Sequence, residues 1–95
     1  MNDDGFEWDD GKAAENWRRH RVSFEEATLA FGDPFAVEWL DNREVYGEER
    51  VVFVGMSQGR LLTVVYTQRG ERVRIISARK ATRYEQDDYY RQNAP

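Results

Sequence analysis

Three apolar segments joined by very short turns limit most tightly how this chain can fold. Residues 50–56, 60–68 and 72–79 are rich in β-branched and other apolar residues, and only three residues separate each segment from the next. This composition favours β-strands. A connection of about three residues joins antiparallel neighbours, because a parallel crossover needs about a dozen or more. With a further short strand at residues 35–40, followed by a polar loop at 41–49, the sequence predicts a four-stranded antiparallel sheet.

Apolar residues occupy both faces of these predicted strands, since side chains alternate between the two faces. In the segment 60–68 the two sets are Leu61 and Val65 against Leu62, Val64 and Tyr66. In the segment 72–79 strict alternation sets Val73 and Ile75 against Ile76 and Ala78. We therefore expect helices to cover both faces of the sheet, at least in part.

Capping signals predict three helices around this sheet. Residues 9–20 begin with acidic and end with basic side chains, as the helix dipole favours. Ser23 and Glu26 have the spacing of a capping box at the start of a second helix. Thr82 and Glu85 have the same spacing and predict a C-terminal helix.

The composition limits the chain to few protein classes. Its 95 residues suffice for one compact domain, and the element order ααββββα predicts an α+β domain over residues 1–95 with its core at about 6–90. No apolar run approaches the ~20 residues of a membrane span, and the acidic start is unlike a signal peptide. The absence of cysteine excludes a disulfide scaffold and a thiolate zinc site. We expect a cytoplasmic protein.

Charge is divided unevenly along the chain. Residues 1–49 carry 14 acidic and 5 basic side chains, whereas residues 50–95 carry 4 acidic and 9 basic ones. Most of the basic residues in the second half are arginine, which holds phosphate or carboxylate through paired hydrogen bonds. Two interpretations stay open: the basic half binds a polyanion, or it pairs internally with the acidic half.

The end of the last predicted strand concentrates basic residues. Alternation gives Arg72 and Arg74 a common face and gives Arg79 the other parity. Lys80 and Arg83 follow Arg79 at the start of the C-terminal helix, whose dipole already attracts anions. This concentration predicts a phosphate-binding site, and the alternative is pairing with glutamates elsewhere in the chain.

Several single side chains have both a chemical and a structural interpretation. His20 is the only histidine, and histidine readily transfers protons near neutral pH; alternatively it complements the C-terminal end of the first helix. Tyr66 could stack on a nucleic-acid base or pack against the sheet. Phe35 and Trp39 could contact a protein partner or belong to the core.

Common motifs of metal, phosphate-loop and nucleophile chemistry are missing. One histidine cannot form a histidine-rich centre, and the carboxylate pairs are sequence neighbours that do not face each other on a helix. One reaction that needs neither a metal nor a cysteine is RNA cleavage by attack of the 2′-hydroxyl on the adjacent phosphorus. It needs only groups that orient the 2′-hydroxyl, stabilise the charge on the phosphoryl oxygens and move protons. We expect no metal site and no cofactor.

A series of short motifs runs in a fixed order through residues 6–90. The motifs are Phe6-Glu7-Trp8-Asp9, then Lys12, Asn16 and His20, then residues 22–27, Asp33-Pro34, residues 48–50, 60–67 and 74–79, Glu85, and Tyr89 or Tyr90. Together they resemble the BrnT family of toxins. The resemblance implies a RelE-like fold and a ribonuclease that inhibits translation, from a bacterial type II toxin–antitoxin pair.

The resemblance also implies a partner and a site. The partner would be a BrnA-like antitoxin with a ribbon-helix-helix domain, in a heterotetramer of two toxins on an antitoxin dimer that contacts operator DNA only through the antitoxin. The matching positions imply five catalytic residues, His20, Glu49, Arg50, Arg74 and Arg79. They imply secondary roles for Lys12 and Tyr66. With Lys80 and Arg83 from the basic strand end, these two make up the predicted RNA-binding residues. Arg74 and Arg79 would stabilise phosphate charge, and Glu49 or His20 would move the proton.

A binding module without activity is the alternative function. Such a module would serve as partner or co-repressor of a ribbon-helix-helix DNA-binding protein. It would keep core residues such as Phe24 and Ile75 but could lose its arginines. The joint presence of His20, Arg50 and Arg79 favours the enzyme.

Overall fold

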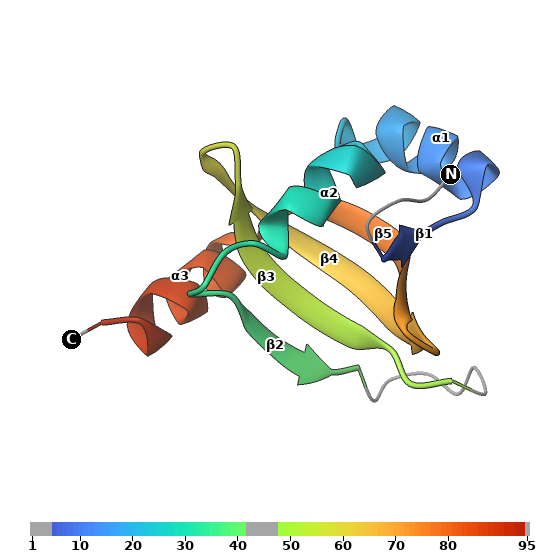
Figure 1. The fold of residues 1–95 in the computed structure, drawn as a ribbon. Coiled ribbons are helices and arrows are strands. Elements are labelled where there is room, and N and C mark those ends of the chain that lie inside the picture. The colour runs from blue at the N-terminus through green and yellow to red at the C-terminus, as the bar shows by residue number, and fades with distance from the viewer. Residues whose placement is uncertain (1–4, 42–47, 95) are drawn as a thin grey trace.

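Eight helices and strands make up the described parts of the chain (Figure 1). The structure is a computed structural model and describes residues 5–41 and 48–94. The helices are α1 (Asp10–His20), α2 (Phe24–Ala30) and α3 (Arg83–Gln92). The strands are β1 (Phe6–Glu7), β2 (Val37–Leu40), β3 (Val51–Ser57), β4 (Arg60–Arg69) and β5 (Arg72–Lys80). Most of the predicted loop at 41–49 lies outside the described residues.

Both predicted capping boxes form. The Ser23 hydroxyl accepts from the Glu26 backbone N–H at 3.0 Å, and the Glu26 carboxylate accepts from the Ser23 N–H at 3.1 Å. Thr82 and Glu85 make the same exchange at 3.1 and 2.8 Å. Each box satisfies amides that the first turn of a helix leaves without partners, so α2 and α3 begin where the sequence predicts.

The sheet has five strands in the order β1-β5-β4-β3-β2. Neighbours from β2 to β5 are antiparallel, as predicted. The prediction of four strands, all antiparallel, is wrong because β1 adds a parallel pairing, with Phe6 opposite Val73 and Glu7 opposite Arg74. The sheet is therefore mixed. A strand of two residues has no alternation to detect, and its partner lies far away in the sequence.

A β-bulge interrupts the pairing of β4 and β5. Val65 pairs with Ser77, but the next residue of β4, Tyr66, pairs with Ile75. Ile76 is therefore an extra residue on β5. A bulge of this kind shifts the alternation of side chains by one position.

The bulge corrects two predictions about β5. Ile75 and Ala78 both lie in the same buried cluster beneath α1 and α2, so the prediction that they point to opposite faces is wrong. Arg79 therefore points to the face opposite that cluster, as Arg72 and Arg74 do. The prediction that Arg79 points to the other face from these two arginines is wrong. Strict alternation could not give this result because it assumes an unbroken strand.

Helices α1 and α2 cover one face of the sheet, here called the helical face (Figure 1). The core beneath them consists of Val22, Phe24, Ala27, Ala30, Phe53, Leu62, Val64, Ile75 and Ala78. Helix α2 approaches β3 closely at Gly55, where an added Cβ would lie 2.8 Å from the backbone oxygen of Ala30. Any larger residue at this position would push α2 away from the sheet.

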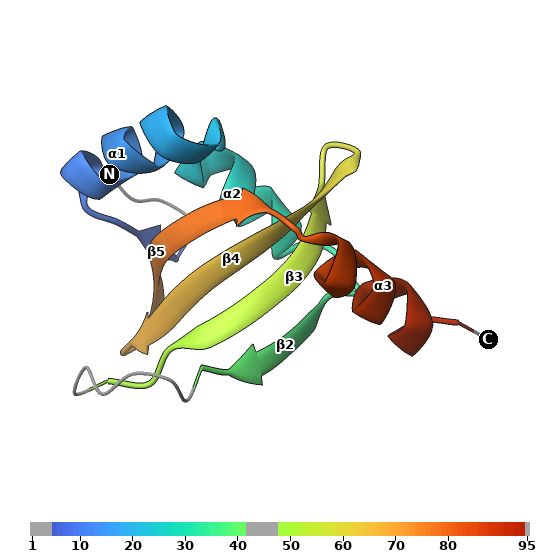
Figure 2. The same cartoon turned by 180° about the vertical axis from the view of Figure 1, so that it is seen from behind.

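Helix α3 covers only one end of the other face, here called the open face (Figure 2). Tyr89 and Ala81 pack there against Val54 and Leu61. The Tyr89 hydroxyl also donates to the Asp33 carboxylate at 2.7 Å. Burial, together with this carboxylate, raises the pKa of Tyr89 to about 12. The prediction that both faces are covered in part is confirmed.

None of the helices in residues 5–41 and 48–94 is long and apolar enough to cross a membrane.

Candidate functional site

The residues that the sequence singled out as a site do not form one cluster. Two of them, Lys12 and His20, lie on α1 at the outer side of β5. Arg74 and Arg79 point to the open face. Glu49 and Arg50 precede β3, and Tyr66, Lys80 and Arg83 lie in three further surroundings. Each group therefore has surroundings of its own.

A hollow of about 190 Å³ lies between α1 and β5, here called the α1 hollow. Its lining residues are Lys12, Glu15, Asn16, Arg19, His20, Ile76 and Ser77. The residues from α1 share one helix face because each lies three or four positions from another member of the set. Helix α1 ends at His20 because the next residue, Arg21, takes a left-handed conformation with φ 55°. This ending leaves the imidazole at the rim of the hollow.

Asn16 fixes α1 against the strand. Its Nδ2 donates to the backbone oxygen of Ala78 at 2.7 Å and to that of Val22 at 2.9 Å. Its Oδ1 accepts from the Ala78 N–H at 3.1 Å. The side chain is 6% exposed, so these bonds form out of contact with water. Lys12 and His20, one turn before and one turn after, are thereby held beside the edge of β5.

The cations around the α1 hollow have no carboxylate partners within the described residues. The one acidic lining residue, Glu15, is bound by Arg18. Across residues 5–41 and 48–94, no ion pair forms to Lys12, Arg19 or His20. Positive charge without a carboxylate partner attracts anions, and the phosphates of a nucleic-acid backbone are such anions.

The open-face arginines have very different surroundings. Glu7 of β1 holds Arg74 at 3.0 Å and Arg72 at 3.3 Å. At the start of β3, Arg50 lies 3.7 Å from Glu48. The interpretation that the basic half pairs internally is therefore confirmed for these arginines.

Arg79 makes the most complete of these pairs. Its two terminal nitrogens bind the two oxygens of Glu85 at 2.8 and 2.9 Å. Thr63 and the Thr82 N–H donate to the same carboxylate, both at 2.8 Å. Burial alone would raise the pKa of Glu85, but the hydrogen bonds from Arg79, Thr82 and Thr63 outweigh it and lower the pKa to about 2. This pair fixes α3 to β5.

A second hollow, of about 300 Å³, lies on the open face beside Arg79. Trp39, Val52 and Val65 form its apolar part. Trp39 is 42% exposed and Phe35 is 58% exposed, so neither side chain has the surroundings of a core residue.

The remaining predicted residues lie apart from both hollows. The ring of Tyr66 contacts Phe31 and Phe53 on the helical face, and its hydroxyl donates to Glu38, so core packing describes its surroundings. The backbone oxygen of Glu49 accepts from Thr67 at 2.7 Å. Arg83 is exposed on α3, 3.6 Å from Asp87. Lys80 lines a further hollow beside α3.

Arg19, Ser77 and Glu85 were not among the predicted site residues. The spacing of Arg19 from Lys12 on one helix face was a signal for the first of them. The capping box of Thr82 and Glu85 was a signal for the last. Ser77 had no signal, because the bulge beside it depends on the pairing with β4. Among the described residues, no group of three or more histidine, aspartate or glutamate side chains is placed to hold a metal ion.

Comparison with known proteins supplies a family. A search of curated proteins finds no match. A family model described as "Ribonuclease toxin, BrnT, of type II toxin-antitoxin system" matches residues 8–85. The match covers most of the chain, from the residue before the α1 cap to the glutamate that binds Arg79. The chain therefore belongs to the BrnT family, the ribonuclease toxins of type II toxin–antitoxin systems.

Proposed function

We propose that this protein is an endoribonuclease that cuts RNA without a metal ion, and that the α1 hollow is its reaction site. One observation carries this assignment: Lys12, Arg19 and His20 border one hollow and make no ion pair within the described residues. The family match supports the ribonuclease class. A site for an RNA phosphate needs positive charge that the protein has not already neutralised.

The chemistry that fits these side chains is attack of a 2′-hydroxyl on the neighbouring phosphorus. His20 takes the proton of the 2′-hydroxyl as that oxygen bonds to phosphorus. Lys12 and Arg19 stabilise the negative charge that grows on the phosphoryl oxygens. The 5′-oxygen leaves with a proton from water, which gives a cyclic phosphate and a free 5′-hydroxyl.

The open-face residues have a different role in this proposal. Arg79 lies two residues from Ser77 on the same strand, but its guanidinium is already bound by Glu85. The predicted catalytic roles of Glu49, Arg50, Arg74 and Arg79 stay predictions. The carboxylates around these arginines favour a role in holding β1, β5 and α3 together.

The cellular role follows from the family. We infer that cleavage inhibits translation in the bacterial cytoplasm and that a BrnA-like antitoxin with a ribbon-helix-helix domain neutralises it. The complex would be a heterotetramer that reaches operator DNA only through the antitoxin. The alternative is an inactive binding module, a partner or co-repressor of the DNA-binding protein.

Cleavage of a mixed-sequence RNA with a chelator present tests the proposal. The wild type should cut, while Lys12→Ala and Arg19→Ala should each cut at least about tenfold more slowly, because hydrogen bonds between charged groups are strong. Arg69→Ala is the matched control, since this exposed arginine at the β4–β5 turn does not line the α1 hollow. It should cut at the wild-type rate, and adding the antitoxin should stop cleavage.

Two results would contradict the proposal. Cleavage that needs added metal would exclude the metal-independent reaction. Failure of a folded wild type to cut either free RNA or messenger RNA on translating ribosomes would favour the inactive binding module.

A further inference from the structure

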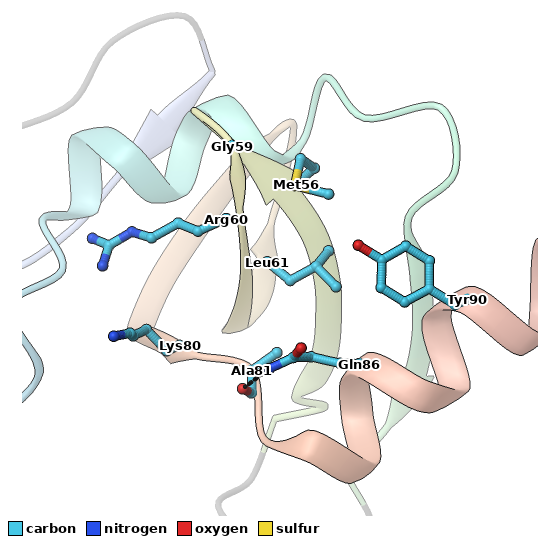
Figure 3. A pocket seen from close by; sticks show the side chains of 8 residues that line it. All are labelled: Met56, Gly59, Arg60, Leu61, Lys80, Ala81, Gln86 and Tyr90. Carbon is cyan, nitrogen blue, oxygen red and sulfur yellow. Dashed lines mark hydrogen bonds between the residues drawn. The ribbon is translucent and has the colours of Figure 1, made fainter.

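A third hollow, of about 300 Å³, lies where the turn between β3 and β4 meets the start of α3 (Figure 3). The lining residues include Met56, Arg60, Leu61, Lys80, Gln86 and Tyr90. Figure 3 shows Arg60 and Lys80 on one side and the Tyr90 ring on the other, with Met56 and Leu61 between them. We call it the Tyr90 hollow.

The apolar side of the Tyr90 hollow offers an aromatic surface. Tyr90 is 56% exposed, and its ring turns toward the side chains of Met56 and Leu61 (Figure 3). Leu61 is buried and belongs to the cluster beneath α3, so this floor is fixed. An exposed ring over a fixed apolar floor suits the face of a nucleic-acid base, which stacks on aromatic side chains.

The polar side offers a hydrogen-bonding group and a cation. Gln86 donates its Nε2 to the Ala81 backbone oxygen at 3.1 Å, and within the described residues its Oε1 accepts no hydrogen bond. This oxygen can accept from the edge of a base. Arg60 is already bound by Glu26 at 2.8 Å. Lys80 makes no ion pair within the described residues and can hold a phosphate.

The Tyr90 hollow lies a short distance along β5 from the proposed reaction site. Ser77 lines the α1 hollow and Lys80 lines the Tyr90 hollow, three residues along the same strand, or about 10 Å. Arg60 also donates to the backbone oxygen of Arg21, just beyond His20 at the end of α1, at 3.2 Å. One RNA strand along this end of the sheet can therefore reach both hollows.

We propose that the Tyr90 hollow is a nucleobase subsite of this ribonuclease. A base close to the cleaved phosphodiester stacks on Tyr90, Gln86 contacts its edge, and Lys80 holds its phosphate. This subsite determines which sequences are cut. The inference depends on the proposed function, because the substrate is RNA in both.

A nucleotide titration tests the subsite without relying on cleavage. The ¹⁵N-labelled full-length chain is titrated with each of the four nucleoside 5′-monophosphates, and the side-chain amide of Gln86 is followed by NMR. We expect this amide to shift, more with one or two bases than with the others, and the shift to vanish in Tyr90→Ala. Absence of a shift with all four nucleotides would overturn the subsite, even if the protein cuts RNA.

Cleavage of a mixed-sequence RNA gives the second test. Tyr90→Ala should cut at least about tenfold more slowly, because loss of one stacked base weakens binding by about that factor or more. Tyr90→Phe, which keeps the ring, should retain most of the rate. Gln86→Ala should change the base preference at the cut sites.

Tyr84→Ala is the matched control, because Tyr84 is a 75% exposed tyrosine of the same helix that does not line the hollow. It should cut as the wild type does. Equal loss in Tyr84→Ala and Tyr90→Ala would overturn the subsite. So would a Tyr90→Ala variant that cuts the same sites at the wild-type rate but resists the antitoxin, since the hollow would then bind the partner protein. Absence of cleavage by the wild type itself would instead contradict the proposed function.

Discussion

Two groups of cations in this protein have opposite surroundings. On the open face, Arg74 and Arg79 each hold a carboxylate at 3.0 Å or less. Around the α1 hollow, Lys12 and Arg19 hold none within the described residues. In the sequence the strand arginines look better suited to phosphate than the cations of α1. Glutamates nevertheless neutralise Arg72, Arg74 and Arg79, whereas α1 keeps positive charge for a ligand. The position of carboxylates, more than the number of arginines, decides which charges can bind an anion.

The comparison also separates stability from activity. A paired arginine at a partly exposed position contributes about 0–1 kcal/mol to folding and offers little field to a ligand. An unpaired cation contributes nothing of this kind, but it attracts phosphate. Substitutions in the two groups should therefore change different quantities.

The largest expected effect is that of His20→Gln on the rate of RNA cleavage. The rate should fall by about 10²- to 10⁴-fold, as it does when a general acid or base is removed. The free energy of unfolding, measured in urea, should change by less than about 0.5 kcal/mol, because the imidazole makes no hydrogen bond or ion pair within the described residues. A variant that cuts at the wild-type rate would place the reaction outside the α1 hollow.

Asn16→Ala should have the largest effect on stability. The free energy of unfolding should fall by about 2–4 kcal/mol, because the buried N–H and oxygen of Ala78 lose their partner. Asn93→Ala is the matched control, an exposed asparagine with two bonds to backbone oxygens, and should cost less than about 1 kcal/mol. Equal losses in urea denaturation would mean that Asn16 does not fix α1.

Glu85→Gln should destabilise the protein in a way that depends on pH. At pH 7 the loss should be about 1–3 kcal/mol, because the charged carboxylate accepts hydrogen bonds from Thr63 and Thr82 as well as from Arg79. The folded pKa of Glu85, about 2, lies below the ordinary value of 4.5. The stabilisation is therefore fully present above about pH 4.5 and is lost as the pH falls toward 2.

Urea denaturation at pH 7, 4 and 3 measures this effect. The difference between wild type and Glu85→Gln should shrink at each step down. Glu71→Gln, at an exposed glutamate in the β4–β5 turn, is the control and should differ little from the wild type at every pH. A difference that stays constant with pH would show that the charge of Glu85 does not stabilise the fold.

The smallest expected effect is on the salt dependence of RNA binding, with the same arginine-to-methionine substitution made in each of the two regions. A plot of log affinity for RNA against log salt has a negative slope. Arg19→Met should make this slope shallower by about 1, because one phosphate contact is lost. Arg72→Met, on the open face and paired with Glu7, should leave the slope unchanged. Filter binding at several salt concentrations measures both. A shallower slope for Arg72→Met, with an unchanged slope for Arg19→Met, would mean that the RNA binds on the open face.

The local parts of this fold could be predicted from the sequence, and the distant ones could not. The capping boxes of α2 and α3 depend on residues three apart, and the antiparallel order of β3, β4 and β5 depends on turns of a few residues. The pairing of Phe6 with Val73 joins opposite ends of the chain. The bulge at Ile76 exists only in the register with β4.

The site could be predicted only in part for the same reason. The motif spacing brought Lys12, Asn16 and His20 together, because all three lie on one helix. The sequence could not show that Glu7 and Glu85 reach the arginines of β5, because those contacts depend on how β1 and α3 pack. It also could not show that the edge of β5 lies beside α1.

The three bonds of Asn16 have a consequence for how copies of this protein meet one another. Beyond its pairing with β1 at Val73 and Arg74, the outer edge of β5 continues toward Lys80. An edge with free backbone groups can recruit a strand from another molecule and start aggregation. At Ala78 the Asn16 amide takes both the N–H and the oxygen, as a neighbouring strand would. A single side chain thus occupies, within its own molecule, the backbone groups at Ala78 that a strand of another copy would need for pairing.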